Sequence, residues 1–117
     1  MPTLYVENDI KLGWAIQEVA TARGYPPIRV CLTLTEARRS LLEDEYDRII
    51  LDVALLDGVG TDLLPDLADA GFRGEIIVVS GVIRKDWMKE VLATALACGL
   101  SIRFLEKVGD WVEEAFA

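Results

Sequence analysis

The sequence has no histidine and only two cysteines among its 117 residues. Without an imidazole, the chain cannot perform Ser-His or Cys-His catalysis by itself, and it cannot bind a metal through histidine. Cys31 and Cys98 have neither the spacing of a zinc site nor that of a CxxC motif. Because both follow apolar or helical stretches, we expect two buried free thiols in a reducing compartment.

Basic residues are also scarce, since 12 Lys and Arg stand against 20 Asp and Glu and the formal net charge is −8. This charge opposes a phosphate backbone and no local basic cluster reverses it, so we expect no nucleic-acid binding. Hydrophobic runs such as 76–79 are far too short to span a bilayer. No basic, apolar leader opens the chain, so we expect no membrane segment and a cytoplasmic protein.

Hydrophobic residues make up 52% of the chain, which is enough for one core without disulfide staples. The length predicts a single domain over residues 1–117. Short β-prone runs alternate with segments that carry apolar residues at helical spacing. These patterns predict strands at 3–6, 28–32, 48–51, 75–79 and 101–105, and helices at 10–23, 33–42, 61–70, 85–98 and 110–116.

Signals for the ends of helices support several of these boundaries. Thr33 with Glu36 has the form of a capping box, and Gly99 follows a helix as an expected left-handed cap. Pro65 falls within the first turn of the helix at 61–70 and weakens that prediction. The stretch 52–60 is rich in Asp and Gly, and we expect a loop there.

Five strands that are each followed by a helix predict a parallel sheet with helices on both faces and right-handed crossovers. The third and fourth strands are continuous apolar runs, as expected for strands that are covered on both faces. The second and fifth carry Arg29 and Arg103, which an edge tolerates. The predicted fold is therefore α/β, a flavodoxin-like (βα)5 three-layer sandwich with a sheet of order 2-1-3-4-5.

In an open sheet of this order, ligands bind beyond the carboxyl ends of the strands, between the first and third strands where the order reverses. Acids, a hydroxyl and a lysine follow those ends: Glu7, Asn8, Asp9, Asp52, Ser80 and Lys107. Carboxylate and carbonyl oxygens suit a hard cation such as Mg²⁺. A hydroxyl and an ammonium group beside that cation can hold the remaining oxygens of a phosphoryl group.

These residues carry a resemblance that covers essentially the whole chain. It resembles a response-regulator receiver domain of two-component signalling, through four segments that stand in order at the strand ends. The segments are 4–9 (LYVEND), 49–52 (IILD) with Gly60 eight residues on, 76–81 (IIVVSG) and 104–107 (FLEK). The stretches around 80–83 and 97–100 also resemble receivers attached to cyclic-di-GMP phosphodiesterase (EAL) domains.

The resemblance implies that Asp52 is the phosphoacceptor and that a partner histidine kinase or phosphotransfer protein supplies the phosphoryl group. Such a receiver is a signalling module that catalyses only its own phosphorylation and dephosphorylation. Mg²⁺ would then be held by the residues that match the family's metal ligands, which are Glu7, Asn8, Asp52 and the backbone carbonyl of Ala54. Ser80 and Lys107 would contact phosphoryl oxygens.

Phe104 occupies the position of the family's aromatic switch, although it is equally well explained as plain core. Receivers commonly use the face formed by the fourth helix, fifth strand and fifth helix to bind an output partner or to form a homodimer. Here that face would comprise 85–98, 101–105 and 110–116.

The chain departs from the family pattern at three positions. Asn8 stands where the family usually has Asp, Val108 where it usually has Pro, and Leu56 where a loop proline is common. The loss of one anionic ligand at Asn8 weakens the expected Mg²⁺ site, unless Asp9 turns inward. As a first-turn acid, Asp9 is equally well explained by the helix dipole.

Two other functions stay open. A pseudo-receiver would bind partners without phosphorylation, and Asn8 and Val108 favour it. A flavodoxin-like cofactor carrier would need a phosphate-binding loop rich in Gly, Ser or Thr after the first strand, and the acidic 7–9 segment opposes it. Mg²⁺ affinity and the reactivity of Asp52 separate a receiver from a pseudo-receiver.

Overall fold

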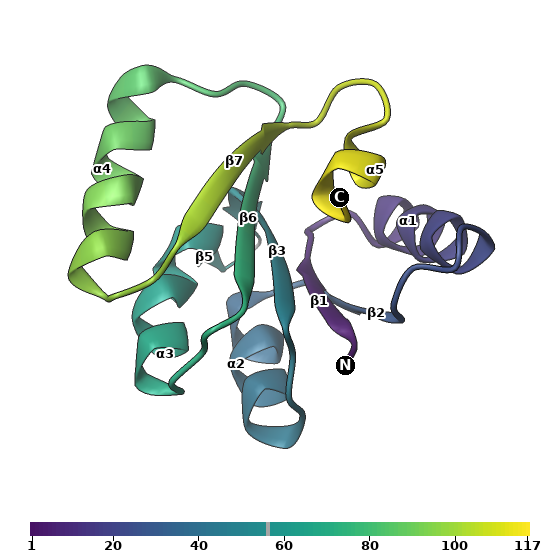
Figure 1. The fold of residues 1–117 in the computed structure, drawn as a ribbon, viewed down its shortest axis with the longest axis horizontal. Helices are drawn as coiled ribbons and strands as arrows, with labels where there is room; N and C mark the ends of the chain where they lie inside the picture. The colour runs from purple at the N-terminus through teal and green to yellow at the C-terminus, as the bar shows by residue number, and fades with distance from the viewer. Residues whose placement is uncertain (56) are drawn as a thin grey trace.

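Five parallel strands form one sheet, and helices cover both of its faces in the computed structural model (Figure 1). The model describes residues 1–55 and 57–117, so the departure at Leu56 lies outside the described residues. The strands of the sheet are β1 (Thr3–Val6), β2 (Ile28–Cys31), β3 (Arg48–Asp52), β6 (Glu75–Ser80) and β7 (Ile102–Glu106). The helices are α1 (Ile10–Ala22), α2 (Leu34–Glu43), α3 (Leu64–Asp69), α4 (Lys85–Ala97) and α5 (Trp111–Ala115).

The strand order is β2-β1-β3-β6-β7, which confirms the predicted order 2-1-3-4-5. β2 and β7, which carry Arg29 and Arg103, are the edges. All four pairings within the sheet are parallel. The carboxyl ends of the strands therefore meet along one border of the sheet, and those of β6 and β7 are at the top of Figure 1.

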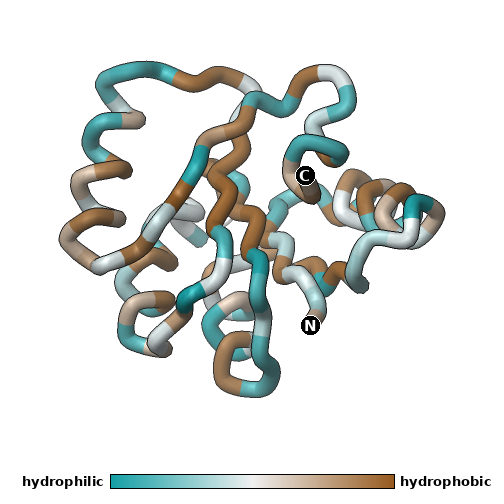
Figure 2. The backbone as a smooth tube through the Cα atoms, viewed as in Figure 1, coloured by the Kyte–Doolittle hydropathy of each residue, from teal (hydrophilic) through white to brown (hydrophobic). Residues whose placement is uncertain are grey.

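Successive side chains of each strand alternate between two hydrophobic cores. Leu4, Ile49 and Val78 belong to the core that also contains residues of α2, α3 and α4. Tyr5 and Ile50 belong to the core that also contains residues of α1 and α5. β3 and β6 are apolar on both faces because both faces are covered, and Figure 2 shows the middle of the sheet as its most hydrophobic part.

The segment from 52 to 60 is more ordered than the expected loop. It contains a short antiparallel hairpin of β4 (Ala54–Leu55) and β5 (Gly58–Val59). The expected helix at 61–70 is divided into the 3₁₀ helix η1 (Gly60–Leu63) and α3. Pro65 explains the division, because it has no N–H to donate to the carbonyl of Thr61 four residues earlier.

Two expectations of burial were wrong in part. Cys31 is buried, but Cys98 is only half-buried because it is the C-cap of α4 at the end of that helix. Trp14, Trp87 and Trp111 lie in segments that the sequence predicts to be helical, where we expect tryptophans to be packing residues, but Trp14 is 58% exposed on α1. Over the described residues, no helix is both long and apolar enough to cross a membrane.

Candidate functional site

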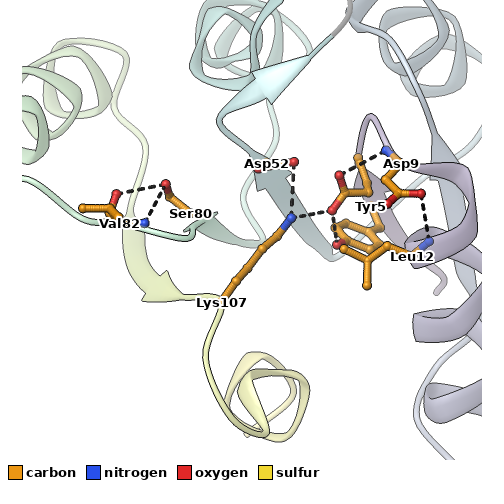
Figure 3. Close-up of polar contacts among 8 residues, drawn as sticks. Tyr5, Asp9, Leu12, Asp52, Ser80, Val82 and Lys107 are labelled. Carbon is orange, nitrogen blue, oxygen red and sulfur yellow. Dashed lines mark hydrogen bonds and ion pairs between the residues drawn. The ribbon is translucent and has the colours of Figure 1, made fainter.

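Three charged side chains that are distant in sequence meet at the carboxyl border of the sheet. Glu7 follows β1, Asp52 ends β3 and Lys107 follows β7. The ammonium Nζ of Lys107 contacts Oε1 of Glu7 and lies 3.2 Å from Oδ2 of Asp52. Figure 3 shows the Lys107 side chain reaching toward Asp52. We call these three residues the carboxylate–lysine cluster. All three are residues that the sequence predicted for the site.

The carboxylate of Glu7 is buried, with 1% of the residue exposed. Besides Lys107, two donors hold it: the hydroxyl of Tyr5 donates to Oε1 at 2.7 Å, and the backbone N–H of Asp9 donates to Oε2 at 3.3 Å. Sequence reasoning missed Tyr5. The signal was present, because residues two apart on a strand share a face and Tyr5 precedes Glu7 by two.

Burial and the interaction between the two carboxyl groups shift the pKa values of Asp52 and Glu7 in opposite directions. Burial, and then the neighbouring Glu7, raises the pKa of Asp52 to about 6. Burial acts in the same sense on Glu7, but hydrogen bonds from Asp52, Lys107 and Tyr5 outweigh it and lower the pKa of Glu7. The pair therefore shares its charge unequally, with Glu7 ionised and Asp52 the carboxyl that takes up a proton first.

The two residues after Glu7 are exposed, unlike Glu7 itself. Asn8 is exposed at the end of β1. Asp9 is the N-cap of α1, and its Oδ1 accepts from the backbone N–H groups of Lys11 at 3.0 Å and Leu12 at 3.3 Å (Figure 3). Of the two explanations for Asp9, the structure therefore supports the helix cap, and Asp9 does not replace the missing ligand.

The carboxylate oxygens of Glu7 and Asp52 suit a hard divalent cation, but two side chains are few ligands for such an ion. Glu7 and Asp52 offer only oxygens, and the ammonium of Lys107 already lies within reach of both, so a single cation can contact the two carboxylates. Within residues 1–55 and 57–117, no group of three or more His, Cys, Asp or Glu side chains is arranged to hold a metal. A cation at this site would therefore depend on Asn8 or on backbone carbonyls for its other protein ligands.

Ser80 is at the predicted strand end, but its hydroxyl is turned away from Asp52. It donates to the carbonyl of Val82 at 2.9 Å and accepts from the N–H of Val82 at 3.4 Å (Figure 3). Beside it lies a cavity of about 170 Å³, lined by Val53, Ser80, Val82, Arg84 and Trp87. The structure thus leaves Ser80 outside the carboxylate–lysine cluster, with open space next to it.

Phe104 lies on the face of β7 opposite to Arg103, toward α4. Its ring is half-buried and packs against Trp87 of α4 edge to face, with 5.5 Å between the ring centroids. Trp87 also lines the cavity beside Ser80, so one indole ring contacts the predicted switch residue and the space next to the predicted hydroxyl.

The loop after Asp52 is held against the start of α2. Asp57, in the turn of the hairpin, accepts from the N–H of Leu34 at 2.8 Å and from the N–H and hydroxyl of Thr35 at 3.2 and 3.0 Å. These bonds, with that from Leu34 first, lower the pKa of Asp57. Sequence reasoning missed this residue as well. The hairpin begins at Ala54, whose backbone carbonyl is a predicted metal ligand.

Gly60 lies at the end of this loop and packs closely against the backbone of Asp52. A Cβ atom at this position would lie 1.8 Å from the carbonyl oxygen of Asp52, so no other residue fits without moving the end of β3. The N–H of Gly60 donates to the carbonyl of Val53 at 2.8 Å, which ties the loop to the residue after Asp52. The match of Gly60 to the receiver pattern thus has a steric reason.

No protein-family model matches the chain, and no curated protein sequence matches it either. Solved structures do match. The receiver domain of the Francisella response regulator 1452 superposes with a TM-score of 0.79 at 21% identity, over 98% of this chain and 89% of that one. This chain has the fold of a response-regulator receiver domain.

Two further solved structures of receiver domains are similar to this chain to about the same extent. A CheY-like receiver domain protein from Methanospirillum hungatei JF-1 gives a TM-score of 0.75 at 19% identity, covering 97% of this chain and 86% of that chain. The receiver domain of the sensor histidine kinase PA1611 from Pseudomonas aeruginosa PAO1, with a magnesium ion coordinated in its active-site cleft, gives 0.73 at 22% identity, covering 97% and 89%. The finer resemblance to receivers attached to EAL domains stays a prediction.

Proposed function

We propose that this chain is the receiver of a two-component phosphorelay, which accepts a phosphoryl group on Asp52 from a partner phosphohistidine with Mg²⁺. The observation that carries this proposal is the carboxylate–lysine cluster, in which an acid at the end of β3 faces a second acid and a lysine on neighbouring strand ends. The chain's lack of histidine agrees with the proposal, because the donor imidazole would belong to the partner.

The transfer needs an ionised Asp52. Its carboxylate oxygen forms a bond to phosphorus, the bond from phosphorus to the partner's imidazole nitrogen breaks, and the electron pair of that bond stays with the imidazole. The phosphoryl oxygens gain negative charge at a point that the ammonium of Lys107 can reach, since Lys107 already lies 3.2 Å from Asp52. Lys107 then stabilises the charge that develops in the transition state.

Glu7, Asn8, Asp52 and the carbonyl of Ala54 are the residues that would hold Mg²⁺. The ion, when bound, would neutralise charge on the transferred group. The magnesium in the PA1611 receiver supports this assignment by analogy of fold. Because Asn8 is a neutral ligand and Asp9 caps α1, we expect weaker binding than a site with three carboxylates would give.

Ser80 and Phe104 would transmit the effect of phosphorylation from Asp52 to the surface. Once Asp52 carries a phosphoryl group, its oxygens are acceptors toward which the Ser80 hydroxyl can turn from Val82. That movement changes the cavity that Ser80 shares with Trp87, and Trp87 packs on Phe104. The face of α4, β7 and α5 would thereby alter its affinity for an output partner or a second copy of the chain.

This face exposes apolar side chains that a partner would cover. Leu92 is 43% exposed and Leu96 is 81% exposed, both on α4. A homodimer and an output protein are both compatible with such a surface. The cytoplasmic location and the lack of nucleic-acid binding expected from the sequence stay predictions.

A pseudo-receiver is the second candidate, and one observation favours it. Lys107 already lies between Glu7 and Asp52, so that the cluster has its own cation, and no carboxylate replaces Asn8 at the end of β1. In that case the chain would bind its partners in one fixed state, and Asp52 would not react.

The reaction of the chain with acetyl phosphate separates the two candidates. We expect a phosphoryl gain in intact mass with Mg²⁺, and no gain for Asp52→Ala or for wild type without Mg²⁺. If wild type gains no mass, and beryllofluoride with Mg²⁺ leaves its tryptophan fluorescence unchanged, the pseudo-receiver is the better description.

A further inference from the structure

Tyr5 is a polar residue in the middle of a hydrophobic core, and packing alone does not explain its hydroxyl. The residue is fully buried, and its ring packs edge to face on Trp111 with 6.0 Å between centroids. A phenylalanine would make the same ring contact. What the hydroxyl adds is the 2.7 Å hydrogen bond to Oε1 of Glu7.

The hydroxyl shares this oxygen with Lys107. Oε1 of Glu7 accepts from both Tyr5 and the ammonium of Lys107, whereas Oε2 accepts from the N–H of Asp9. A carboxylate has only acceptor oxygens, so in this bond the phenol is the donor and Glu7 the acceptor.

Under the proposed function, Lys107 has two tasks in succession. Before phosphorylation it pairs with Glu7 and Asp52, and afterwards it pairs with an oxygen of the phosphoryl group on Asp52. The second task draws the ammonium away from Glu7. Since Glu7 is 1% exposed, bulk water cannot replace the lysine as the donor to Oε1. Mg²⁺ would balance the charge of Glu7, and the Tyr5 hydroxyl would be the hydrogen-bond donor that stays at Oε1 and fixes the orientation of the carboxylate.

We propose that Tyr5 is a positioning residue whose hydroxyl keeps the buried Glu7 carboxylate paired and oriented while Lys107 moves to the phosphoryl group. Tyr5 thereby lowers the cost of the activated state without touching the reacting atoms. This inference rests on the proposed function and deepens it. It also gives a reason for a tyrosine on β1 two residues before the acid, on the same face of the strand.

The test compares two variants that each lose one buried hydroxyl. Tyr5→Phe removes the bond to Glu7. Tyr46→Phe is the matched control, because Tyr46 is 7% exposed and its hydroxyl bonds to Ser40 in the other core, on the α2 side. Both variants keep their rings, and urea unfolding checks that each is folded and how much stability it loses.

The decisive readout is the affinity for beryllofluoride at saturating Mg²⁺, measured by isothermal titration calorimetry. We expect Tyr5→Phe to bind about tenfold more weakly than wild type, the lower end of what a hydrogen bond to an ionised group contributes. We expect Tyr46→Phe to bind within about twofold of wild type, even where the two variants lose similar stability.

Wild-type affinity in Tyr5→Phe, or an equal loss in both variants, would overturn the positioning role and leave Tyr5 as a structural residue. In either case wild type still binds beryllofluoride, and the proposed function stands. If wild type itself binds none, the proposed function is wrong and the role of Tyr5 within it is wrong as well.

Discussion

Asp52 combines two properties that are typical of an acid in a functional site and that a structural residue avoids. It is buried, with 8% of the residue exposed, and it lies beside a second carboxylate. Both properties oppose its ionisation, and the Lys107 ammonium only partly compensates for them. A reactive acid that is held at a cost in stability is a common feature of functional sites.

This cost predicts how stability depends on pH. Because the pKa of Asp52 rises from 3.8 to about 6 on folding, its contribution to stability is full below pH 4 and is lost as the pH rises through 6. Asp52→Asn is neutral at every pH. At pH 7.5 we expect its free energy of unfolding to exceed that of wild type by about 1–3 kcal/mol.

Urea unfolding of both proteins between pH 4 and 8 measures the difference, which we expect to shrink toward zero at pH 4. The lowered pKa of Glu7 acts in the opposite sense, and because part of that lowering comes from Asp52, the comparison measures the two acids as a coupled pair. A variant that is less stable than wild type at pH 7.5 would show that the attraction of Lys107 outweighs the burial of Asp52.

A residue could be predicted to lie in the site where the end of a strand alone decides its position. Glu7, Asp52 and Lys107 follow directly from the strand ends, because parallel strands bring their carboxyl ends to one border. The direction of the Ser80 hydroxyl was not predictable, since it depends on a local bond to Val82. Whether Asp9 caps the helix or binds a metal likewise depends on which backbone N–H groups lie within hydrogen-bond distance of its carboxylate.

At the scale of the elements, the hairpin after β3 is tied to the N-terminus of α2 by Asp57. Its carboxylate accepts bonds from Leu34 and from Thr35, which are otherwise free donors in the first turn of that helix. The same hairpin starts at Ala54, two residues after Asp52. Asp57 therefore both stabilises α2 and positions the loop that follows Asp52.

We expect Asp57→Ala to lower the melting temperature by about 2–5 °C. It should also weaken Mg²⁺ binding severalfold, because the loop that carries the Ala54 carbonyl loses its anchor. Asp44→Ala is the control, since its ion pair with Arg29 is between exposed side chains and contributes little. Melting curves and Mg²⁺ titrations that do not distinguish the two variants would contradict the role of Asp57.

Most elements could be predicted because their hydrophobic periods and end signals agree. Thr33 caps α2 through its side chain, and Gly99 has the left-handed φ of +71° that a helix end favours. The hairpin at 54–59 was missed because two-residue strands are too short to show a period. The division of the helix at 61–70 follows from Pro65, although the sequence alone did not show that the first turn would be 3₁₀.

At the scale of the whole molecule, the topology brings Glu7 and Lys107 together from positions 100 apart in sequence. β7 is an edge strand, separated from β1 by β6 and β3, and the loop that follows β7 together with the long lysine side chain covers this interval. The edges were predictable from Arg29 and Arg103 because charged residues are tolerated there. The identity of a partner on the α4 face is not encoded in this way, since exposed leucines suit many partners.

The central claim is that Asp52 and no other residue carries the phosphoryl group. After reaction with acetyl phosphate and Mg²⁺, borohydride reduces an aspartyl phosphate to homoserine, and peptide mass spectrometry then locates the changed residue. We predict homoserine at position 52 in wild type and none in a sample without Mg²⁺. Conversion at another acidic residue, or at none, would contradict the account.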